Sequence, residues 1–269
     1  MTPGLDVIIV TYQTKDDVLR CLASVCAHPP HVLRDVVVVD NASSDGTVSA
    51  VTAAWPAVRV LALEKNLGFA AANNRAIAMT SSPLVLLLNS DTIVGPGALD
   101  RLVDRLVATG ATAAGPRLVD AHGRPEISFG PALSPVGELV QRWRVGLARR
   151  SWAPARAYVA RLVSRERDVD WVSGACLLVR REAAVTAGLL DERYFMYEED
   201  VDFCAALRRH GGRVLFTPSA EVTHLRGRSV RSAPAATRAH YDRSHLAFYE
   251  KHHPGWVPWL RWWKRVRGR

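Results

Sequence analysis

The chain has 269 residues, of which 48% are hydrophobic and 23% charged, a composition that suits one large or two small globular domains and excludes extensive disorder. Its apolar runs are far shorter than the roughly 20 residues of a membrane-spanning helix, and its N-terminus lacks the basic and apolar regions of a signal peptide, so we expect neither. The net charge of +9 comes from residues 226–269, which contain 11 basic and 2 acidic residues and therefore favour a polyanionic partner.

The first half of the chain alternates apolar runs with amphipathic segments. Continuous apolar runs predict buried strands at residues 6–12, 35–40, 58–63 and 84–88. Apolar residues at helical spacing predict helices at residues 15–26, 68–79 and 96–108, and another helix is expected to begin near Ser44. This alternation indicates βαβ units and a mainly parallel sheet that is covered by helices on both faces.

The second half is less regular. Residues 131–168 contain scattered prolines and eight arginines with weak helical periodicity, and we interpret them as a mobile insertion. We expect a strand at 170–179, then a helix, an acidic cluster at 198–202, a strand at 213–216 and an extended segment at 219–224. The four cysteines have no CxxC or metal-binding spacing, so we expect them to be small buried residues in a reducing compartment.

Polar residues follow each predicted strand of the first half. They are Thr11-Tyr12, Asp40-Asn41, Glu64-Lys65-Asn66 and Asn89-Ser90-Asp91. Ligands of such sheets bind outside the carboxyl ends of the strands, so we expect these four groups to converge on one cleft.

Three segments at these strand ends suggest specific interactions. Asp40 could accept hydrogen bonds from a nucleotide base or ribose, although the alternative is a helix cap. The polar turn and helix at Asn66–Asn74 suit a sugar or a nucleotide, and a plain helix cap is equally compatible with them. Asp91 could bind Mg²⁺ or Mn²⁺ together with diphosphate oxygens and waters, or it could be an ordinary turn residue.

The acidic cluster is the strongest local signal for catalysis. Four carboxylates lie within residues 198–202, and their mutual repulsion raises the cost of ionising all of them. Helical spacing places Asp200 on the side of Phe203 and Leu207, facing inward, while Asp202 faces elsewhere. An inward carboxylate is a candidate general base, and the alternative is an acid-rich first turn that interacts with the helix dipole.

The histidines give weaker signals. His224 follows the last extended segment, and a lone histidine in such a position is more often structural than a ligand. We interpret the pair His252-His253 as surface residues.

Taken together in this order, the segments resemble the inverting family-2 glycosyltransferases with a GT-A fold. The resemblance covers Val7 to Arg228 and rests on IVTYQ at 9–13, VVDNASSDGT at 38–47, EKNLGFAAANN at 64–74, LLLNSD at 86–91, WVSGACLLVRR at 171–181 and LLDERYFMYEEDVDFCAALRRHG at 189–211. Within the family, the chain is most similar to bacterial rhamnosyltransferases, including the actinobacterial type that acts on polyprenyl-diphosphate-linked N-acetylglucosamine. The implied fold is a single Rossmann-like, mainly parallel sheet flanked by helices, with a C-terminal amphipathic basic extension.

The resemblance also implies roles for individual residues. The nucleotide-sugar donor would be bound by Thr11, Tyr12, Asp40, Asn66, Asn73, Asn89, Ser90 and Asp91. Asp91 occupies the second acidic position of the family's DxD motif and would bind Mg²⁺ or Mn²⁺, with His224 completing the metal site. Asn89 replaces the first aspartate of that motif, which leaves the site with less negative charge.

The resemblance likewise identifies a catalytic and an acceptor side. Glu199-Asp200 matches the family's ED motif, with Asp200 as the base and Glu199 as the orienter of the acceptor hydroxyl or the alternate base. Trp171, Ser173 and Gly174 would line the acceptor side. The implied domains are a glycosyltransferase domain at 1–225, divided into a nucleotide-sugar-binding half at 1–116, the insertion at 131–168 and an acceptor and catalytic half at 169–225, followed by the extension at 226–269.

The implied function is metal-dependent inverting transfer of a hexose in cell-envelope polysaccharide synthesis. The expected donor is dTDP-rhamnose, and the expected acceptor is a hydroxyl of a glycan or of a polyprenyl-diphosphate-linked sugar. Direct displacement on a β-linked donor would give an α-rhamnoside. The alternatives are the same fold with a UDP- or GDP-sugar, or a catalytically degenerate protein that binds a nucleotide-sugar. A sugar nucleotidyltransferase is less compatible, because residues 11–17 lack a glycine-rich loop with a suitably placed lysine.

The C-terminal extension suggests a location. Trp256, Trp259, Leu260 and Trp263 recur at helical spacing, with basic residues on the other side. Tryptophan next to lysine and arginine is typical of a membrane-interface segment. We therefore expect a cytoplasmic protein bound peripherally to the inner face of the cytoplasmic membrane, and no nucleic-acid partner. The alternative is a C-terminal helix that packs its tryptophans against the domain.

Overall fold

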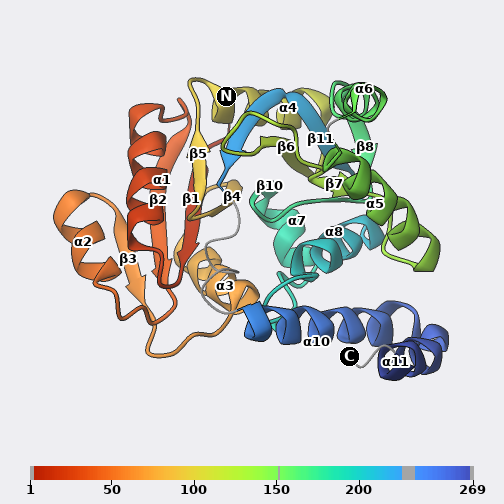
Figure 1. The fold of residues 1–269 in the computed structure, drawn as a ribbon. Coiled ribbons are helices and arrows are strands. Elements are labelled where there is room, and N and C mark those ends of the chain that lie inside the picture. Colours follow the sequence, from red (N-terminus) through yellow and green to blue (C-terminus); the bar gives the residue numbers. More distant parts are fainter. Residues whose placement is uncertain (1–2, 151, 226–233, 267–269) are drawn as a thin grey trace.

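The computed structural model describes residues 3–150, 152–225 and 234–266. Helices cover both faces of a mixed, nine-stranded sheet with the strand order β3-β2-β1-β4-β10-β6-β11-β5, in which β8 pairs with β11 (Figure 1). Two short strands, β7 and β9, form a separate small sheet. In the described part of the chain, no helix is long and apolar enough to cross a membrane.

The first half of the chain forms the elements that its apolar runs predict. The parallel strands are β1 (Leu5–Thr11), β2 (Leu33–Asp40), β3 (Arg59–Ala62) and β4 (Leu84–Asn89). The helices are α1 (Lys15–Ala27), α2 (Thr47–Ala54), α3 (Phe69–Met79) and α4 (Ala98–Thr109). The predicted α/β class with a mainly parallel first half is confirmed.

The remaining strands lie in both sheets, with β6 and β11 parallel to each other and β5, β8 and β10 antiparallel to their neighbours. These elements are β5 (Thr92–Val94), β6 (Ala113–Val119), β7 (Phe129–Gly130), β8 (Arg167–Val169), β9 (Trp171–Val172), β10 (Cys176–Arg180) and β11 (Val214–His224), with helices α7 (Arg181–Thr186) and α8 (Glu199–Arg209). The two segments expected at 213–216 and 219–224 form one strand, β11, whose pairing with β6 shifts register between Thr217 and Glu221.

The single strand expected at 170–179 is wrong. Residues 173–175 separate β9, which pairs with β7, from β10, which lies in the main sheet between β4 and β6. Both neighbours of β10 run antiparallel to it. The interruption coincides with Gly174, whose amide bonds to a side chain instead of to a neighbouring strand.

The insertion at 131–168 contains two helices, α5 (Pro135–Ala148) and α6 (Ala153–Leu162). Ser134 caps α5 by accepting a hydrogen bond from the amide of Gly137 at 3.0 Å, and Pro135 suits the first helical turn. The helical periodicity of this segment is weak because α5 fully buries only Gly137. Helix α6 packs on the core through Val159 and Leu162. The mobility of this segment stays a prediction.

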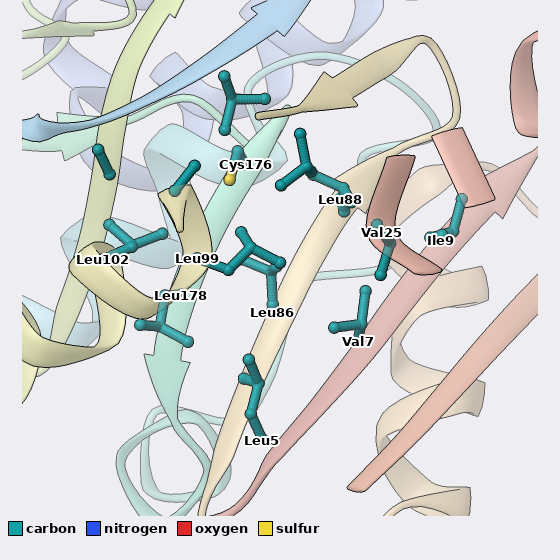
Figure 2. Packing of buried hydrophobic residues seen from close by; sticks show 14 of the residues in the cluster. Leu5, Val7, Ile9, Val25, Leu86, Leu88, Leu99, Leu102, Cys176 and Leu178 are labelled. Carbon is teal, nitrogen blue, oxygen red and sulfur yellow. The ribbon is translucent and has the colours of Figure 1, made fainter. Parts of the chain in front are cut away.

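Two hydrophobic layers lie on opposite faces of the sheet. Alternate residues of β1 point to opposite layers, so Val7 and Ile9 pack with α1, α2 and α4, whereas Ile8 packs with α3, α6, α7 and α8. Figure 2 shows the first layer, in which Leu99 of α4 and Val25 of α1 pack on β1, β4 and β10. Three cysteines are buried as predicted, and Cys26 is exposed.

The described part of the C-terminal extension is helical and packs on the domain. It comprises α10 (Pro234–His252), the short 3₁₀ helix η1 (Pro254–Trp256) and α11 (Val257–Val266), while residues 226–233 and 267–269 lie outside the described residues. Val257 and Leu260 join Phe248 and Tyr249 in a third apolar cluster around Tyr194 and Val201. Figure 1 shows α10 passing below α8 toward α11.

Candidate active site

The carboxyl ends of β1 and β2 place Thr11 beside Asp40, as the parallel register requires. The side chain of Asp40 is almost fully buried, and its Oδ2 accepts a hydrogen bond from the amide of Ser43 at 2.8 Å. Its buried Oδ1 has no hydrogen-bond partner among the described residues. Gly46, and not Asp40, occupies the N-cap position of α2. Asp40 therefore offers one free acceptor atom in a position where a ligand's donor would satisfy it.

The turn before α3 is fixed by two asparagines. Asn66 Oδ1 accepts from the amide of Gly68 at 2.9 Å, while Asn41 donates to the Gly68 carbonyl at 3.1 Å and accepts from the Leu67 amide. Gly68 has φ = +84°, and a Cβ there would lie 2.3 Å from the carbonyl oxygen of Phe195. Only glycine allows this approach, which brings the start of α3 against the segment that precedes α8.

Two predicted donor-binding residues differ in accessibility. Tyr12 is 46% exposed and free to contact a ligand. Asn73 is fully buried in α3 and donates to the Phe69 carbonyl of its own helix at 2.9 Å. Its buried Oδ1 has no hydrogen-bond partner among the described residues, so the direct contact between Asn73 and the donor stays a prediction.

The Asn89-Ser90-Asp91 segment follows β4 and is tied to the end of β1. Thr14 Oγ1 lies 2.9 Å from Thr11 Oγ1 and 3.2 Å from Ser90 Oγ, so three hydroxyl groups form a chain across the strand ends. Strand β5 begins directly after Asp91 and pairs with β11, with His224 opposite Thr92. This register brings His224 Nε2 to 3.2 Å from Asp91 Oδ1, although the two residues are far apart in sequence.

His224 lies between two carboxylates. Its Nδ1 is 3.3 Å from Glu126 Oε2, on the side of the ring opposite Asp91. Burial disfavours the charged imidazole, but the hydrogen bonds to Asp91 and Glu126 outweigh it and raise the pKa of His224. When Nδ1 donates to Glu126, the Nε2 lone pair points at Asp91, and a cation between them would satisfy both groups. Glu126 lies in a loop and carries no sequence signal that singles it out.

The fit of these residues to a divalent metal follows from this donor set. Among the residues that the structure describes, no group of three or more His, Cys, Asp or Glu side chains is arranged to hold a metal ion. Asp91 and His224 Nε2 would supply two ligands to a metal that takes its remaining ligands from diphosphate oxygens and water.

Asp200 lies at the same edge of the sheet. Because β10 runs antiparallel to β4, the residues just before Cys176 lie at the carboxyl end of β4, where the Asn89 amide donates to the Ala175 carbonyl at 3.0 Å. The Gly174 amide donates to Asp200 Oδ2 at 2.8 Å, and the Val201 amide donates to Oδ1 at 2.9 Å. Asp200 is half-buried at this edge.

The predicted acceptor residues adjoin Asp200. Trp171 Nε1 donates to the Pro131 carbonyl at 2.9 Å, and the Ser173 amide donates to the Ser128 carbonyl at 2.8 Å. A Cβ on Gly174 would lie 3.3 Å from the Cβ of Asp200. The break between β9 and β10 thus positions the Asp200 carboxylate.

The other acidic residues of the cluster have contrasting environments. Burial and the nearby charge of Asp200 raise the pKa of Glu199 well above its usual value, and Glu199 Oε2 is buried without a hydrogen-bond partner among the described residues. Burial, Asp200 and Glu138 raise the pKa of Glu198 to about 8. Burial also raises the pKa of Asp200, against the opposing hydrogen bonds from Gly174 and Val201.

Asp202 is the exception in this cluster. Its side chain is 2% exposed, and it forms ion pairs with Lys251 and His252 of α10. Although burial acts in the opposite direction, hydrogen bonds from His252 and Lys251 keep the pKa of Asp202 below its usual value. The interpretation of His252 and His253 as surface residues is therefore wrong, since His252 binds Asp202 at 2.6 Å and His253 binds the Leu133 carbonyl at 2.7 Å.

Comparison with known proteins identifies the family. Residues 3–257 match the profile of the family described as "Glycosyltransferase like family 2". A Mycobacterium tuberculosis protein named N-acetylglucosaminyl-diphospho-decaprenol L-rhamnosyltransferase is 36% identical over 281 residues, which cover 97% of this chain and 89% of that protein.

Solved structures agree on the fold. A mannosyltransferase from Pyrobaculum calidifontis in complex with GDP-Man and Mn²⁺ has a TM-score of 0.63 at 19% identity, over 97% of this chain and 69% of that chain. The structure of GalNAc-T7 with UDP, GalNAc and Mn²⁺ has a TM-score of 0.62 at 16% identity, over 83% of this chain and 44% of that chain.

The mixed sheet and its likeness to these solved structures define a GT-A fold. The chain belongs to glycosyltransferase family 2. The resemblance seen in the sequence and the expected fold are both confirmed.

Proposed function

We propose that this protein is a metal-dependent inverting rhamnosyltransferase that moves L-rhamnose from dTDP-rhamnose to a hydroxyl of a polyprenyl-diphosphate-linked sugar in cell-envelope polysaccharide synthesis. The observation that carries the transfer chemistry is the Asp200 carboxylate, bound by the Gly174 amide at the edge of the sheet where Asp40 and Asp91 lie. The choice of sugar and acceptor is supported by the name of the M. tuberculosis relative, which is 36% identical.

The environments of the paired carboxyl groups favour Asp200 as the base. Asp200 accepts two backbone amide hydrogen bonds, which stabilise its ionised form, whereas Glu199 has a buried oxygen without a partner among the described residues. Glu199 is thus the protonated member of the pair, and it can donate a hydrogen bond to the acceptor. Two carboxyl groups whose environments separate their pKa values can divide the base and orienting roles in this way.

In the reaction, Asp200 takes the proton of the acceptor hydroxyl as that oxygen attacks the anomeric carbon. The attack comes from the face opposite the nucleotide, so the carbon–oxygen bond to the diphosphate breaks and the anomeric centre inverts. Asp40 Oδ1 accepts from the base or ribose of the donor, and the hydroxyl chain Thr11-Thr14-Ser90 lies under the donor. Trp171 and Ser173 line the side from which the acceptor enters.

Asp91 and His224 would hold Mg²⁺ or Mn²⁺, with Glu126 orienting the imidazole ring. A bound divalent ion supplies charge stabilisation for the diphosphate leaving group. Asn89 contributes a neutral side chain where a carboxylate would add charge, so donor binding is expected to contribute a large part of the metal affinity.

The exposed tryptophans support peripheral attachment to a membrane. Trp256, Trp259 and Trp262 are 47%, 49% and 58% exposed, while Val257 and Leu260 anchor α11 to the domain. The segment thus docks through its aliphatic residues and leaves these three indoles exposed next to exposed arginines, while Trp263 is half-buried. Such a surface suits the anionic inner face of the cytoplasmic membrane, where a lipid-linked acceptor is located.

A donor panel tests the proposal. We would measure thermal stabilisation by dTDP-rhamnose, UDP-glucose, UDP-galactose, UDP-N-acetylglucosamine, UDP-galactofuranose and GDP-mannose, each with and without Mn²⁺ or Mg²⁺. We expect metal-dependent stabilisation by dTDP-rhamnose alone. Preference for a UDP- or GDP-sugar would overturn the rhamnose assignment and leave the transfer mechanism intact. No stabilisation by any donor would indicate a degenerate site, with Asn89 as the first cause to examine.

A further inference from the structure

Helix α10 packs against the segment that carries the catalytic carboxylates. Two of its residues contact the segment just before α8, one through a backbone carbonyl and one through an aromatic ring. Ser244 Oγ donates to the Met196 carbonyl at 2.8 Å, and the ring of His240 stacks on Phe195 with 4.3 Å between ring centroids. The same segment is contacted from the other side by α3, where the Phe69 amide donates to the Phe195 carbonyl at 2.8 Å.

The backbone of this segment is strained. Tyr197 and Glu198 are consecutive non-glycine residues with φ values of +71° and +68°. Such a conformation is costly for a non-glycine residue and persists only when the surrounding structure imposes it. Because Asp200 follows directly in the first turn of α8, its position depends on the contacts that maintain this conformation.

Among these contacts are two buried ion pairs between α10 and Asp202. Lys251 Nζ lies 2.8 Å from Asp202 Oδ2, and His252 Nε2 lies 2.6 Å from Oδ1. Lys251 also binds Asp191 Oδ2 at 2.7 Å, so it links the stretch before Tyr194 to the first turn of α8. All three members of the Lys251–Asp202–His252 contact are largely or fully buried.

An ion pair in this setting is poorly explained by stability alone. Removing two charges from water carries a large desolvation penalty, and well-packed apolar residues often stabilise a fold equally well. A buried charge pair does fix the relative position of the two elements that carry it, because each charge must stay in contact with the other. Asp202 belongs to the same hydrogen-bonded turn as Asp200, since its amide donates to the Glu198 carbonyl at 2.8 Å. Movement of Asp202 is therefore transmitted to Asp200.

We propose that Lys251 and His252 are positioning residues for the transfer reaction, which act through Asp202 to fix the Asp200 carboxylate against the Gly174 amide. This inference rests on the proposed role of Asp200 as the base. It assigns α10, which lies outside the strand-end cleft, to the catalytic apparatus. Neither lysine nor histidine touches the substrate in this arrangement. Their effect is on the geometry of attack, where misplacement by about 1 Å can cost as much as 100-fold in rate.

The test compares Lys251→Met and Lys251→Arg with a control variant of another lysine. Lys264→Met is the control, because Lys264 also forms a partly buried ion pair, with Asp242 of α10 at 3.0 Å, and lies in α11, away from the segment before α8. Steady-state kinetics with a detergent-solubilised lipid acceptor, at a temperature well below each variant's Tm, would give kcat and donor KM separately. We expect Lys251→Met to lower kcat at least 10-fold with donor KM within 2-fold, Lys251→Arg to recover most of it, and Lys264→Met to match wild type.

A second measurement keeps the inference testable if Lys251→Met fails to fold. The cavity beside the pair has a volume of about 570 Å³ and is lined by Lys251, Asp202 and Arg209. Lys251→Ala would leave room there for propylammonium, and we expect added propylamine to restore kcat in a saturable manner. The inference would be overturned if Lys251→Met or Lys251→Ala folds and keeps the wild-type kcat. It would also be overturned if Lys264→Met lowers kcat as much as Lys251→Met does.

Asp200→Asn separates failure of the inference from failure of the proposed function. If Asp200→Asn retains turnover, the base has been misassigned and the proposed mechanism fails. If Asp200→Asn is inactive while folded Lys251→Met has full activity, the mechanism stands and only the positioning role is wrong.

Discussion

Replacing Glu198 with glutamine removes a carboxyl group that the fold buries next to the catalytic pair. Glu198 is 8% exposed, and burial, Asp200 and Glu138 together raise its pKa from 4.5 to about 8. Between these values the folded protein binds a proton that the unfolded chain releases. The stability that this proton provides is complete below pH 4.5 and is lost as pH rises through about 8.

The size of the effect follows from the width of this window. A shift from 4.5 to about 8, at roughly 1.4 kcal/mol per pH unit, gives an upper limit of about 5 kcal/mol for the stability lost above pH 8. Glu198→Gln removes this titration. Between pH 5 and pH 8.5, the free energy of unfolding should therefore fall less in the variant than in wild type. The difference between the two decreases should be several kcal/mol at most.

Urea unfolding at these two pH values measures the difference directly. Glu182→Gln is the matched control, because Glu182 is an exposed glutamate of α7 away from the cluster, and it should follow wild type. Equal pH dependence in wild type and Glu198→Gln would refute the reasoning, because it would mean that the burial of Glu198 does not favour its protonated form.

Three further changes have defined outcomes. Gly68→Ala combines φ = +84° with a Cβ 2.3 Å from the Phe195 carbonyl and should cost about 3 kcal/mol in urea unfolding, whereas Gly46→Ala, with φ = +81° and open space, should cost about 1 kcal/mol. Asp40→Asn keeps an acceptor for the Ser43 amide but replaces the free oxygen, so calorimetry should show donor affinity reduced about 10- to 100-fold with little change in Tm. Trp259→Ser should weaken binding to phosphatidylserine vesicles without changing donor affinity, and unchanged vesicle binding would contradict membrane contact by α11.

Strands β1, β2 and β4 were predictable because they are largely buried on both faces and therefore read as continuous apolar runs. Strand β5 was missed because it has only three residues, and β6 because its Ala-Ala-Gly-Pro start lacks the branched residues that favour strands. The helix α5 gave a weak signal because its apolar residues Val136 and Leu139 are exposed.

Part of the candidate site was predictable because ligands of parallel sheets bind outside the carboxyl ends of the strands. Asp40 and Asp91 were located by their position after strands, and Asp200 by its place in a helical turn. Glu126 and Lys251 were missed because each meets its partner through tertiary structure, 98 residues from His224 and 49 residues from Asp202.

The most direct test of the account is the anomeric configuration of the product made by wild type and by Asp200→Asn. The reaction would contain dTDP-β-L-rhamnose, a short polyprenyl-diphosphate-linked N-acetylglucosamine and Mg²⁺ or Mn²⁺, and NMR would identify the new linkage. We predict an α-rhamnoside from wild type and no product from Asp200→Asn, which should still bind the donor with wild-type affinity. A β-linked product, or turnover retained by Asp200→Asn, would contradict inverting transfer with Asp200 as the base.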